Sequence, residues 1–334
     1  MISSHDKERR LAEIRREAEQ HQPEAFSLPA APAPESGYYG LPVLKGPQWK
    51  WEVPAYLFVG GTAGAAAFVA GAGSLFEARP RLIRDARNLA AVCGALSPPL
   101  LISDLGKPSR FLGMFRVFKL RSPMSVGSWT LMVFANSAIA SAYLGTRRSH
   151  GPLSSILGSA AHVVSGLSGL AMTTYTGVLL GVTAIPAWSE NAVLLPLHFS
   201  ASALGSAVSL LQFLGHENDP ALRRLGIFSA AAETAVGAAI ELRSSPAMRP
   251  LKRGTSGWLT RAGGLLSGPL PLALRLMAGR NQDKRSVKLR RWAAASTVVG
   301  SLLTRYAWLK AGSAAARDPS LVLTRPADRQ PKTV

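Results

Sequence analysis

Long apolar runs alternate with short, polar and strongly basic segments along most of the chain. The first run begins at Val53 and reads VPAYLFVGGTAGAAAFVAGAGSLF, close to the ~20 apolar residues that an α-helix needs to cross a bilayer. Further runs predict helices at about residues 88–105, 124–145, 155–185, 191–214, 221–242, 256–278 and 289–311. The pattern therefore predicts an all-α fold, a polytopic membrane bundle of about eight transmembrane helices.

Prolines interrupt two of these predicted helices. Pro98 and Pro99 lie in the second, where neighbouring helices can satisfy the backbone carbonyls that a proline frees. Pro269 and Pro271 cut the seventh, which also carries two arginines. The seventh run is therefore the weakest of the predicted spans. Trp188, just after the fourth, is expected to be an anchor at the membrane–water interface.

The ends of the chain have a different composition. Residues 1–50 begin with a charged stretch that predicts a short amphipathic helix, and they continue with a linker, PAAPAPES, that is too rich in Pro and Ala to pack. Residues 313–334 are polar. We therefore expect a polar N-terminal arm over 1–50, a membrane domain over 51–312 and a C-terminal tail. Eight spans would place both termini on one side of the membrane.

Small residues recur within the apolar runs. Hydrophobic residues make up 47% of the chain and charged residues only 17%, and Gly, Ala and Ser let helix backbones approach closely in a bilayer. The glycines of the first run could be mistaken for a nucleotide-binding loop, but their place inside an apolar span indicates helix packing. They are Gly60, Gly61, Gly64, Gly71 and Gly73.

The net charge of +19 is of the kind found in proteins that bind nucleic acid. Here, however, the basic residues cluster in the gaps between apolar runs, as in loops that face anionic lipid headgroups. The charge therefore indicates a lipid bilayer as partner and no nucleic acid. Basic loops occur on both sides, so sidedness stays open. The clusters are Arg79, Arg81, Arg84 and Arg87; Lys107, Arg110, Arg116, Lys119 and Arg121; and Arg280, Lys284, Arg285, Lys288, Arg290 and Arg291.

Two long motifs point to a known family. The entry to the first run reads KGPQWKWEVPAYLFVGGTAGAAAFVAGA, and the connection after the second contains DLGKPSRFL followed by SPMSVGSW. Shorter matches are TYTGVLLGVTAIPAW, LPLHFSASALGSA and LLTRYAWLKAG. Over about residues 37–319 the chain resembles the NrfD/PsrC family, the integral membrane subunit of polysulfide reductase and related complexes.

The resemblance implies a quinone- or quinol-reactive subunit of a respiratory oxidoreductase complex in the cell's inner (cytoplasmic) membrane. Such a subunit exchanges electrons with a ferredoxin-like iron–sulfur partner, itself often attached to a molybdopterin oxidoreductase. The quinone would be menaquinone or ubiquinone. The chain would be incomplete as an enzyme without its partner subunits, and some family members are proposed to couple quinone chemistry to proton transfer.

Ionisable side chains within apolar helices are costly in a bilayer and mark candidate functional positions. From the ~1.5 Å rise per helical residue, His198 and Tyr175 lie level on adjacent antiparallel helices, with Glu233 in the same half of the membrane. Asp104 closes the second helix on that side. The ionisable candidates are Asp104, His162, His198, Glu233 and Glu241.

This group offers what a quinone site requires. Tyr175 and His198 can donate hydrogen bonds to carbonyl oxygens, and Glu233 with His198 can carry protons. Simpler interpretations stay open: Tyr175 and His198 can make structural interhelical hydrogen bonds, and Glu233 can bond to a Ser or Thr hydroxyl. Asp104 fits a structural role better, bound to loop amides or paired with a nearby basic residue: Lys107, Arg110 or Arg116.

The third helix opens with an aromatic candidate. Trp129 follows Ser122 and Pro123, which predict an N-cap and a first helical residue. Trp129 is then either an interfacial anchor or a wall against a quinone ring. The basic connection between Lys107 and Arg121, with its phenylalanines, is either a platform for a soluble electron carrier or an amphipathic segment on the lipid surface.

Metal centres are not expected in this chain. It has a single cysteine, Cys93, whereas an iron–sulfur cluster takes about four thiolates. A b-type haem needs axial ligands at one depth, but His162 and His198 differ by roughly 20 Å in depth. We therefore expect no haem and no iron–sulfur cluster.

Two other functions fit the same pattern less closely. Broken helices with buried charges also occur in secondary transporters, although the two halves of the chain show no evident inverted repeat. A non-catalytic membrane anchor for a peripheral redox enzyme would have the same composition and the same partner.

Overall fold

The computed structural model describes a helical bundle. It covers residues 44, 46–47, 49–105, 111, 113–116, 118–146, 151–318 and 321. Contacts divide the chain into two units, Met1–Val43 and Leu44–Val334, and all of these residues belong to the second. Every regular element within them is a helix, which confirms the all-α prediction. Most of the predicted N-terminal arm over 1–50 lies outside the described residues, and so does the predicted tail over 313–334 except for residues 313–318 and 321.

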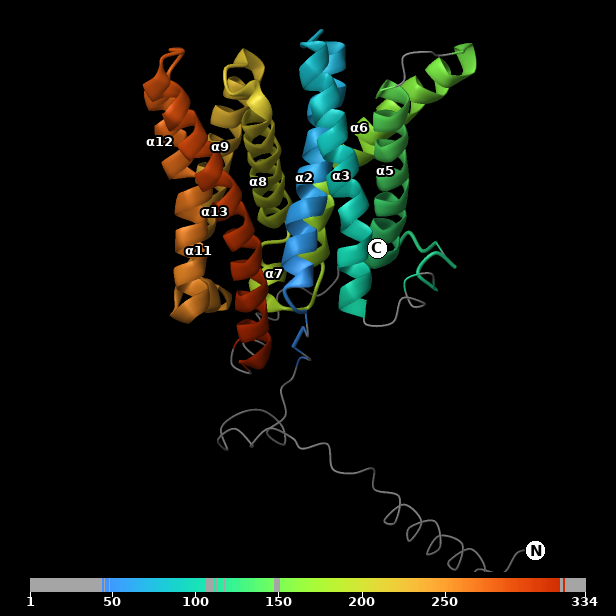
Figure 1. The fold of residues 1–334 in the computed structure, drawn as a ribbon. Helices are drawn as coiled ribbons and strands as arrows, with labels where there is room; N and C mark the ends of the chain where they lie inside the picture. The colour runs from blue at the N-terminus through green and yellow to red at the C-terminus, as the bar shows by residue number, and fades with distance from the viewer. Residues whose placement is uncertain are drawn as a thin grey trace, which may run out of the picture. The chain divides into compact units, whose positions relative to one another are not determined.

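The helices run up and down along one common direction (Figure 1). The beginning of α2 and the end of α13 lie at the same end of the bundle. The elements are α2 (Glu52–Leu75), α3 (Pro80–Leu105), α5 (Pro123–Thr146), α6 (Pro152–Gly181), α7 (Pro186–Ser189), α8 (Leu194–Leu211), a π-turn η2 (Gln212–His216), α9 (Pro220–Glu241), a 3₁₀ turn η3 (Pro246–Met248), α10 (Arg249–Lys252), α11 (Gly254–Ser267), α12 (Pro269–Ala278) and α13 (Lys284–Arg317).

Within the part of the chain that the structure describes, three helical segments are long and apolar enough to cross a membrane: α2, α6 and the continuous stretch Leu194–His216 formed by α8 and η2. Together with the apolar surface of the bundle, they identify a helical membrane protein. The figure of about eight spans stays a prediction. Of the remaining long helices, α3 and α13 each begin with a basic segment, whereas α5 carries no charged residue.

The second predicted helix begins earlier than expected. α3 starts at Pro80 rather than near Asn88, because proline is favoured in the first turn of a helix, where its missing N–H costs nothing. Arg81, Arg84 and Arg87 therefore lie on α3, and our prediction that they fill a loop was wrong. Their spacing of three residues places them on neighbouring positions of one helix face.

The seventh predicted helix is divided, as its prolines suggested. α11 ends at Ser267, Gly268 adopts non-helical dihedral angles, and Pro269 begins α12. At the start of α5, the predicted cap is confirmed: the Ser125 backbone N–H donates to Ser122 Oγ at 3.4 Å, and Pro123 is the first helical residue.

Close helix packing on α2 confirms the interpretation of its glycines. A Cβ atom at Gly64 would lie 2.4 Å from the carbonyl oxygen of Gly169 on α6. Such a Cβ would clash with the carbonyl oxygen. Because Gly64 has no side chain, the backbones of α2 and α6 can meet directly. α2 packs against α3, α6 and α8, and it is the central helix of the apolar core.

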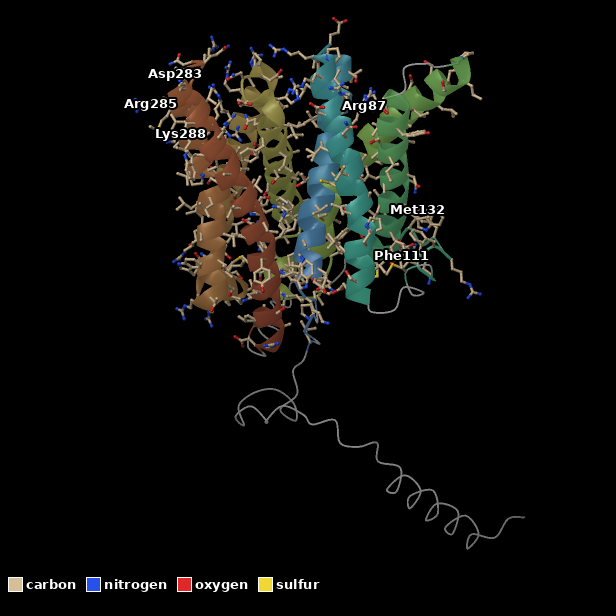
Figure 2. The ribbon with its side chains drawn as sticks, viewed as in Figure 1. Arg87, Phe111, Met132, Asp283, Arg285 and Lys288 are labelled. Carbon is tan, nitrogen blue, oxygen red and sulfur yellow. The ribbon has the colours of Figure 1, made fainter. Side chains whose placement is uncertain are left out.

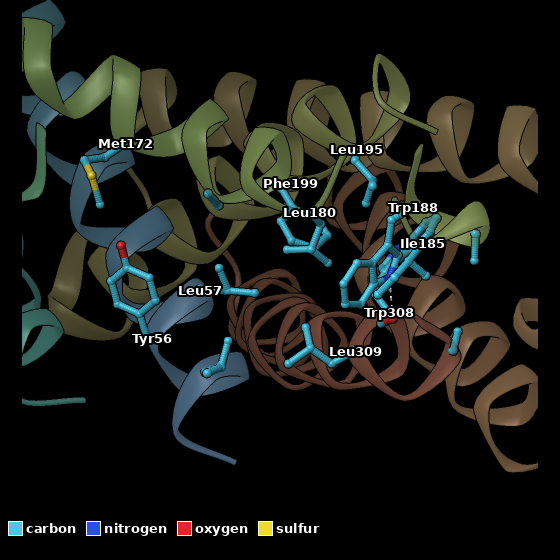
Figure 3. Packing of buried hydrophobic residues seen from close by; sticks show 14 of the residues in the cluster. Tyr56, Leu57, Met172, Leu180, Ile185, Trp188, Leu195, Phe199, Trp308 and Leu309 are labelled. Carbon is cyan, nitrogen blue, oxygen red and sulfur yellow. Dashed lines mark hydrogen bonds between the residues drawn. The ribbon is translucent and has the colours of Figure 1, made fainter. Parts of the chain in front are cut away.

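Trp188 is not an interfacial anchor, and that prediction was wrong. It is fully buried on the short helix α7 and its indole Nε1–H donates to the Trp308 carbonyl oxygen at 2.8 Å. Its ring stacks on Trp49, with centroids 5.5 Å apart. Figure 3 shows Trp188 and Trp308 within the same apolar cluster as Phe199. A buried indole with a carbonyl partner gains packing that an interfacial position would lack.

Candidate functional site

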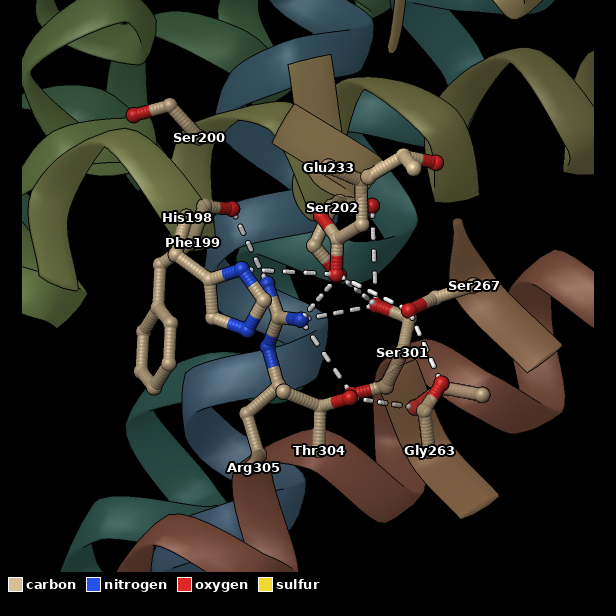
Figure 4. A network of polar contacts seen from close by, with 12 residues as sticks. His198, Phe199, Ser200, Ser202, Glu233, Gly263, Ser267, Ser301, Thr304 and Arg305 are labelled. Carbon is tan, nitrogen blue, oxygen red and sulfur yellow. Dashed lines mark hydrogen bonds and ion pairs between the residues drawn. The ribbon is translucent and has the colours of Figure 1, made fainter. Parts of the chain in front are cut away.

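The structure brings two of the predicted residues together. His198 lies on the first turns of α8 and Glu233 on α9, with His198 Nδ1 3.7 Å from Glu233 Oε1 (Figure 4). Both residues are almost completely buried. This distance is too long for a direct hydrogen bond, but the two groups interact electrostatically, and the low-dielectric surroundings strengthen that interaction.

Each carboxylate oxygen of Glu233 has different surroundings. Oε1 accepts a hydrogen bond from Ser267 Oγ at 2.9 Å, and Ser267 is the last residue of α11. Oε2 is buried and has no hydrogen-bond partner in the described structure, nor has His198 Nδ1. Buried polar atoms are nearly always paired in native proteins. These two atoms therefore indicate a position where a ligand or water completes the hydrogen bonds.

Arg305 completes the cluster, and sequence analysis missed it. The side chain comes from α13 and is fully buried. Its Nη1 donates to Ser301 Oγ at 2.8 Å and to Ser202 Oγ, and its Nη2 donates to the Phe199 carbonyl oxygen at 3.0 Å. Its guanidinium carbon lies 4.7 Å from the centroid of the Phe199 ring. The signal was present, because Arg305 lies within the predicted helix 289–311.

Arg305 interacts electrostatically with both His198 and Glu233. Glu233 therefore has a buried cation close by, supplied by another helix. The serines around the guanidinium are neutral, so they leave its positive charge uncompensated.

A cavity of about 350 Å³ adjoins this cluster. Its inner wall is formed by His198, Glu233, Thr304 and Trp308. Its outer residues lie on α9 and α11 and at the start of α12, and several of them are exposed at the side of the bundle: Ala238, Arg261, Leu265 and Pro269. The cavity therefore connects buried polar atoms with the lateral surface of the bundle, between α9 and α11.

One edge of the opening carries an ion pair. Arg261 Nη2 lies 3.2 Å from Glu241 Oε1, and both side chains are substantially exposed. Glu241 was one of the predicted intramembrane ionisable residues, and its position at the end of α9 explains how its charge is accommodated. At the inner end, Trp308 Nε1 is a further buried donor without a partner.

Tyr175 is directed to a different part of the bundle. Its hydroxyl donates to the Pro123 carbonyl oxygen at 2.7 Å, and its ring fills the space beside Gly127, where a Cβ atom would lie 1.7 Å from the ring. Tyr175 therefore joins α6 to the beginning of α5. The helical rise gave its depth but not the direction of its side chain.

Asp104 and Trp129 also lie apart from the His198–Glu233 pair. The Asp104 carboxylate is beside the backbone N–H of Lys50, just before α2, and two of its suggested partners, Lys107 and Arg110, lie outside the described residues. Trp129 packs edge-on against Phe115 and Phe118, with centroids 5.6 Å and 5.9 Å apart. Trp129 also lines an apolar cleft of about 490 Å³ between α5 and α6.

Polar side chains continue from His198 along one face of α8. They recur every three or four residues, as a single helix face requires, and all are buried: Ser202, Ser206, Ser209, Gln212 and His216. Arg275 on α12 donates to Gln212 Oε1 at 3.0 Å and to Ser209 Oγ at 3.1 Å. Arg275 and Arg305 thus place two cations along this row.

The comparisons with known proteins give one match. A sequence model of the family described as polysulphide reductase, NrfD, matches residues 44–229. No individual curated protein matches the chain. The matched region includes α2, α3, α5, α6, α8 and the first part of α9. Because it covers more than half of the sequence, the chain belongs to the NrfD family.

Proposed function

We propose that this chain is the quinone-reactive membrane subunit of a respiratory oxidoreductase complex, and that quinone or quinol binds in the cavity between α9 and α11. The observation that carries the proposal is the course of this cavity. It leads from the lateral surface of the bundle to His198 and Glu233, whose buried Nδ1 and Oε2 atoms have no hydrogen-bond partner among the described residues.

The lateral opening and the apolar lining of the cavity suit a quinone. Quinones dissolve in the apolar part of the bilayer, and a lateral opening admits them without passage through water. Apolar and small residues form much of the wall, including Ala238, Leu265 and Trp308, while the polar atoms are confined to the inner end. Ligand sites of this kind combine an apolar lining with a few well-placed polar groups.

His198 and Glu233 have complementary roles in this proposal. A bound quinol or quinone supplies the two-electron, two-proton redox chemistry. His198 Nδ1 hydrogen-bonds an oxygen of the ring and takes up or returns one proton, and Glu233 Oε2 takes up or returns the other. Ser267 holds the carboxylate through Oε1, which leaves Oε2 free among the described residues to bond the ligand.

Protons exchange with water most readily at the edge of the cavity formed by Glu241, where α9 ends. An excess proton moving along the polar face of α8 would approach the fixed charges of Arg305 and Arg275, and like charges repel strongly in a low-dielectric interior. The opening instead carries Glu241, an exposed carboxylate. We therefore assign proton uptake and release to the α9–α11 side.

The electrons pass to or from a partner subunit. The chain has one cysteine and so cannot supply the ~4 thiolates of an iron–sulfur cluster. The family to which it belongs supports a ferredoxin-like iron–sulfur partner attached to a molybdopterin oxidoreductase, in the cell's inner membrane. Ubiquinone and menaquinone both fit the cavity chemistry.

The test is the binding of a fluorescent quinol analogue to the purified, partner-bound complex. Replacement His198→Ala should weaken binding about tenfold, because a hydrogen bond worth about 1.4 kcal/mol is lost. Tyr175→Phe is the matched control: it also removes a buried hydrogen-bond donor, but one directed to Pro123. Binding by Tyr175→Phe should equal that of the wild type.

Other outcomes would support other interpretations. Weaker binding by Tyr175→Phe and Trp129→Ala, with His198→Ala unchanged, would place the quinone in the α5–α6 cleft. Absence of binding by an assembled wild-type complex would overturn the quinone proposal and favour a membrane anchor. Substrate accumulation in vesicles without any redox partner would favour a secondary transporter.

A further inference from the structure

A cluster of arginines lies at the end of the bundle where α2 ends and α3 begins, near the position of Arg87 in Figure 2. Two cavities meet there, of about 480 Å³ and 470 Å³, and both are lined by Ser74, Arg87 and Gly145. Arg81 and Arg84 line the first cavity, while His162 and three serines of α6 line the second. None of these residues belongs to the proposed quinone site.

Arg87 is held in place by neutral groups. Its Nε–H donates to His162 Nδ1 at 3.1 Å, so Nδ1 must carry the lone pair and the ring proton must be on Nε2. That proton can be donated to Ser74 Oγ, 2.9 Å away, and Ser74 Oγ donates in turn to the Ala70 carbonyl oxygen at 3.1 Å. This chain orients the guanidinium without neutralising its charge.

The outer nitrogens of Arg87 remain available. Its structural hydrogen bond uses Nε alone, and Nη1 lies against Gly145, where a Cβ atom would be 2.9 Å away. No carboxylate pairs with Arg87 among the described residues. Guanidinium nitrogens in this arrangement can hold an anion through two parallel hydrogen bonds.

Neighbouring charges leave the cluster positive. Arg81 Nε and Arg84 Nε lie 3.7 Å and 3.6 Å from the carboxylate of Asp85, which also pairs with His216 Nε2 at 2.8 Å. A single carboxylate is therefore shared by two arginines and one imidazole. Arg87 adds a third guanidinium group that is not paired with this carboxylate.

The second cavity borders an apolar, exposed surface. Leu144 and Val163 line it beside the serines Ser154, Ser155 and Ser159. The N-terminal half of α6 exposes Leu153, Ile156 and Leu157, and in Figure 1 this end of α6 leans outward from the other helices. A ligand anchored at Arg87 would thus lie with its polar part among hydroxyl groups and its apolar part along α6.

We propose that the Arg81–Arg84–Arg87 cluster binds the phosphate headgroup of an anionic phospholipid, with an acyl chain along the exposed face of α6. Basic pockets between membrane helices are suited to such headgroups. A free phosphate ion would satisfy the arginines equally well, but it would make no use of the adjoining apolar surface. The inference is independent of the quinone proposal, because the two sites share no residue.

The test is lipid binding to the full-length protein in a neutral detergent. Phosphatidylglycerol, phosphatidylcholine and inorganic phosphate are added separately, and binding is followed by native mass spectrometry and by the midpoint of thermal unfolding. We expect phosphatidylglycerol to bind with defined stoichiometry and to raise the midpoint. Replacement Arg87→Gln should weaken this binding about tenfold, as expected for loss of a charge-assisted hydrogen bond.

Two further variants make the result specific. Arg285→Gln removes an exposed basic residue of α13 that lies away from Arg87 in Figure 2, and it should bind phosphatidylglycerol like the wild type. Arg84→Gln changes a side chain that is 58% exposed, so it should fold normally even where Arg87→Gln does not, and should bind a few-fold more weakly.

Three results would overturn the proposal. Equal binding of phosphatidylcholine would show that the headgroup charge is not recognised. Equal protection by inorganic phosphate alone would show a site for free anions. Equal losses in Arg84→Gln and Arg285→Gln would show attraction by overall charge rather than by this cluster.

Discussion

At the scale of single residues, the core of this protein depends on positions where a large side chain packs directly against a glycine. The indole of Trp188 lies directly against Gly312 of α13, and a Cβ atom at Gly312 would be 2.0 Å from the ring. The same indole is fixed by its hydrogen bond to the Trp308 carbonyl oxygen. Trp188 therefore cannot move aside without losing that bond.

Replacement Gly312→Ala should lower the free energy of unfolding by about 1–3 kcal/mol, because a methyl group is forced into a filled site. The measurement is the thermal unfolding midpoint in detergent. The matched control is Gly237→Ala in α9, where a new Cβ meets nothing within 4 Å, and where alanine is the better helix former. Equal midpoints for the two variants would contradict this account of Trp188.

Sequence reasoning selected candidate residues by the free-energy cost of an ionisable group in a bilayer, and the structure brings two of them together. His198 and Glu233 were selected because ionisable groups are expensive within apolar helices, and the structure places them 3.7 Å apart. Arg305 met the same criterion and was missed. Tyr175 shows the limit of the method: a helix position fixes depth, but the direction of a side chain depends on how the helices are rotated and packed.

At the scale of elements, the end of α8 has an unusual turn. η2 replaces the last α-helical turn with a π-turn, and Gly215 within it has a φ of +97°. This geometry directs His216 to Asp85 on α3, at 2.8 Å. The turn therefore connects α8 to the start of α3.

Gly215→Ala should destabilise the protein by about 1–2 kcal/mol, because the Cβ of an L-residue in a left-handed conformation lies too close to the following carbonyl oxygen. The space around Gly215 is not the reason: a Cβ would meet only Arg81 Nη2, at 3.6 Å. Gly215→Asn should recover part of the loss, since asparagine tolerates this conformation. Thermal unfolding of both variants is the measurement, and identical losses would point to a steric cause.

Element boundaries were predictable where proline chemistry governs them. The start of α5 after Ser122 and the break before Pro269 followed from local rules. The start of α3 did not, because charged residues between apolar runs suggested a loop, whereas Pro80 begins a helix that carries its arginines beyond the apolar part. Hydropathy marks the part of a helix that lies in lipid and not the helix itself.

At the scale of the whole molecule, the basic connection before α5 is the surface to which we assign the redox partner. Arg116, Lys119 and Arg121 are exposed, while Phe115 and the partly exposed Phe118 pack edge-on against Trp129. The aromatic residues thus stabilise the connection, and the charged residues remain for contact. An electrostatic surface of this kind raises association rates more than it raises affinity.

Replacement of both Arg116 and Lys119 by Glu should slow association with the iron–sulfur partner about tenfold at low salt, and the difference should shrink as salt screens the charges. Surface plasmon resonance on the immobilised membrane subunit measures both rates. A double replacement at the opposite end of the bundle, Arg285→Glu with Lys288→Glu, is the control. Unchanged rates in the first variant would favour a connection that lies on the lipid surface.

Because the proposed site opens laterally between α9 and α11, the concentration that governs ligand binding is the concentration in the bilayer. A ligand that enters from the bilayer is sensed by its mole fraction in lipid, not by its molarity in water. Apparent affinities of inhibitors would then follow their partition coefficients and would fall as more lipid is added at a fixed total dose. Two compounds with equal contacts inside the cavity could thus differ greatly in potency through solubility in the membrane alone.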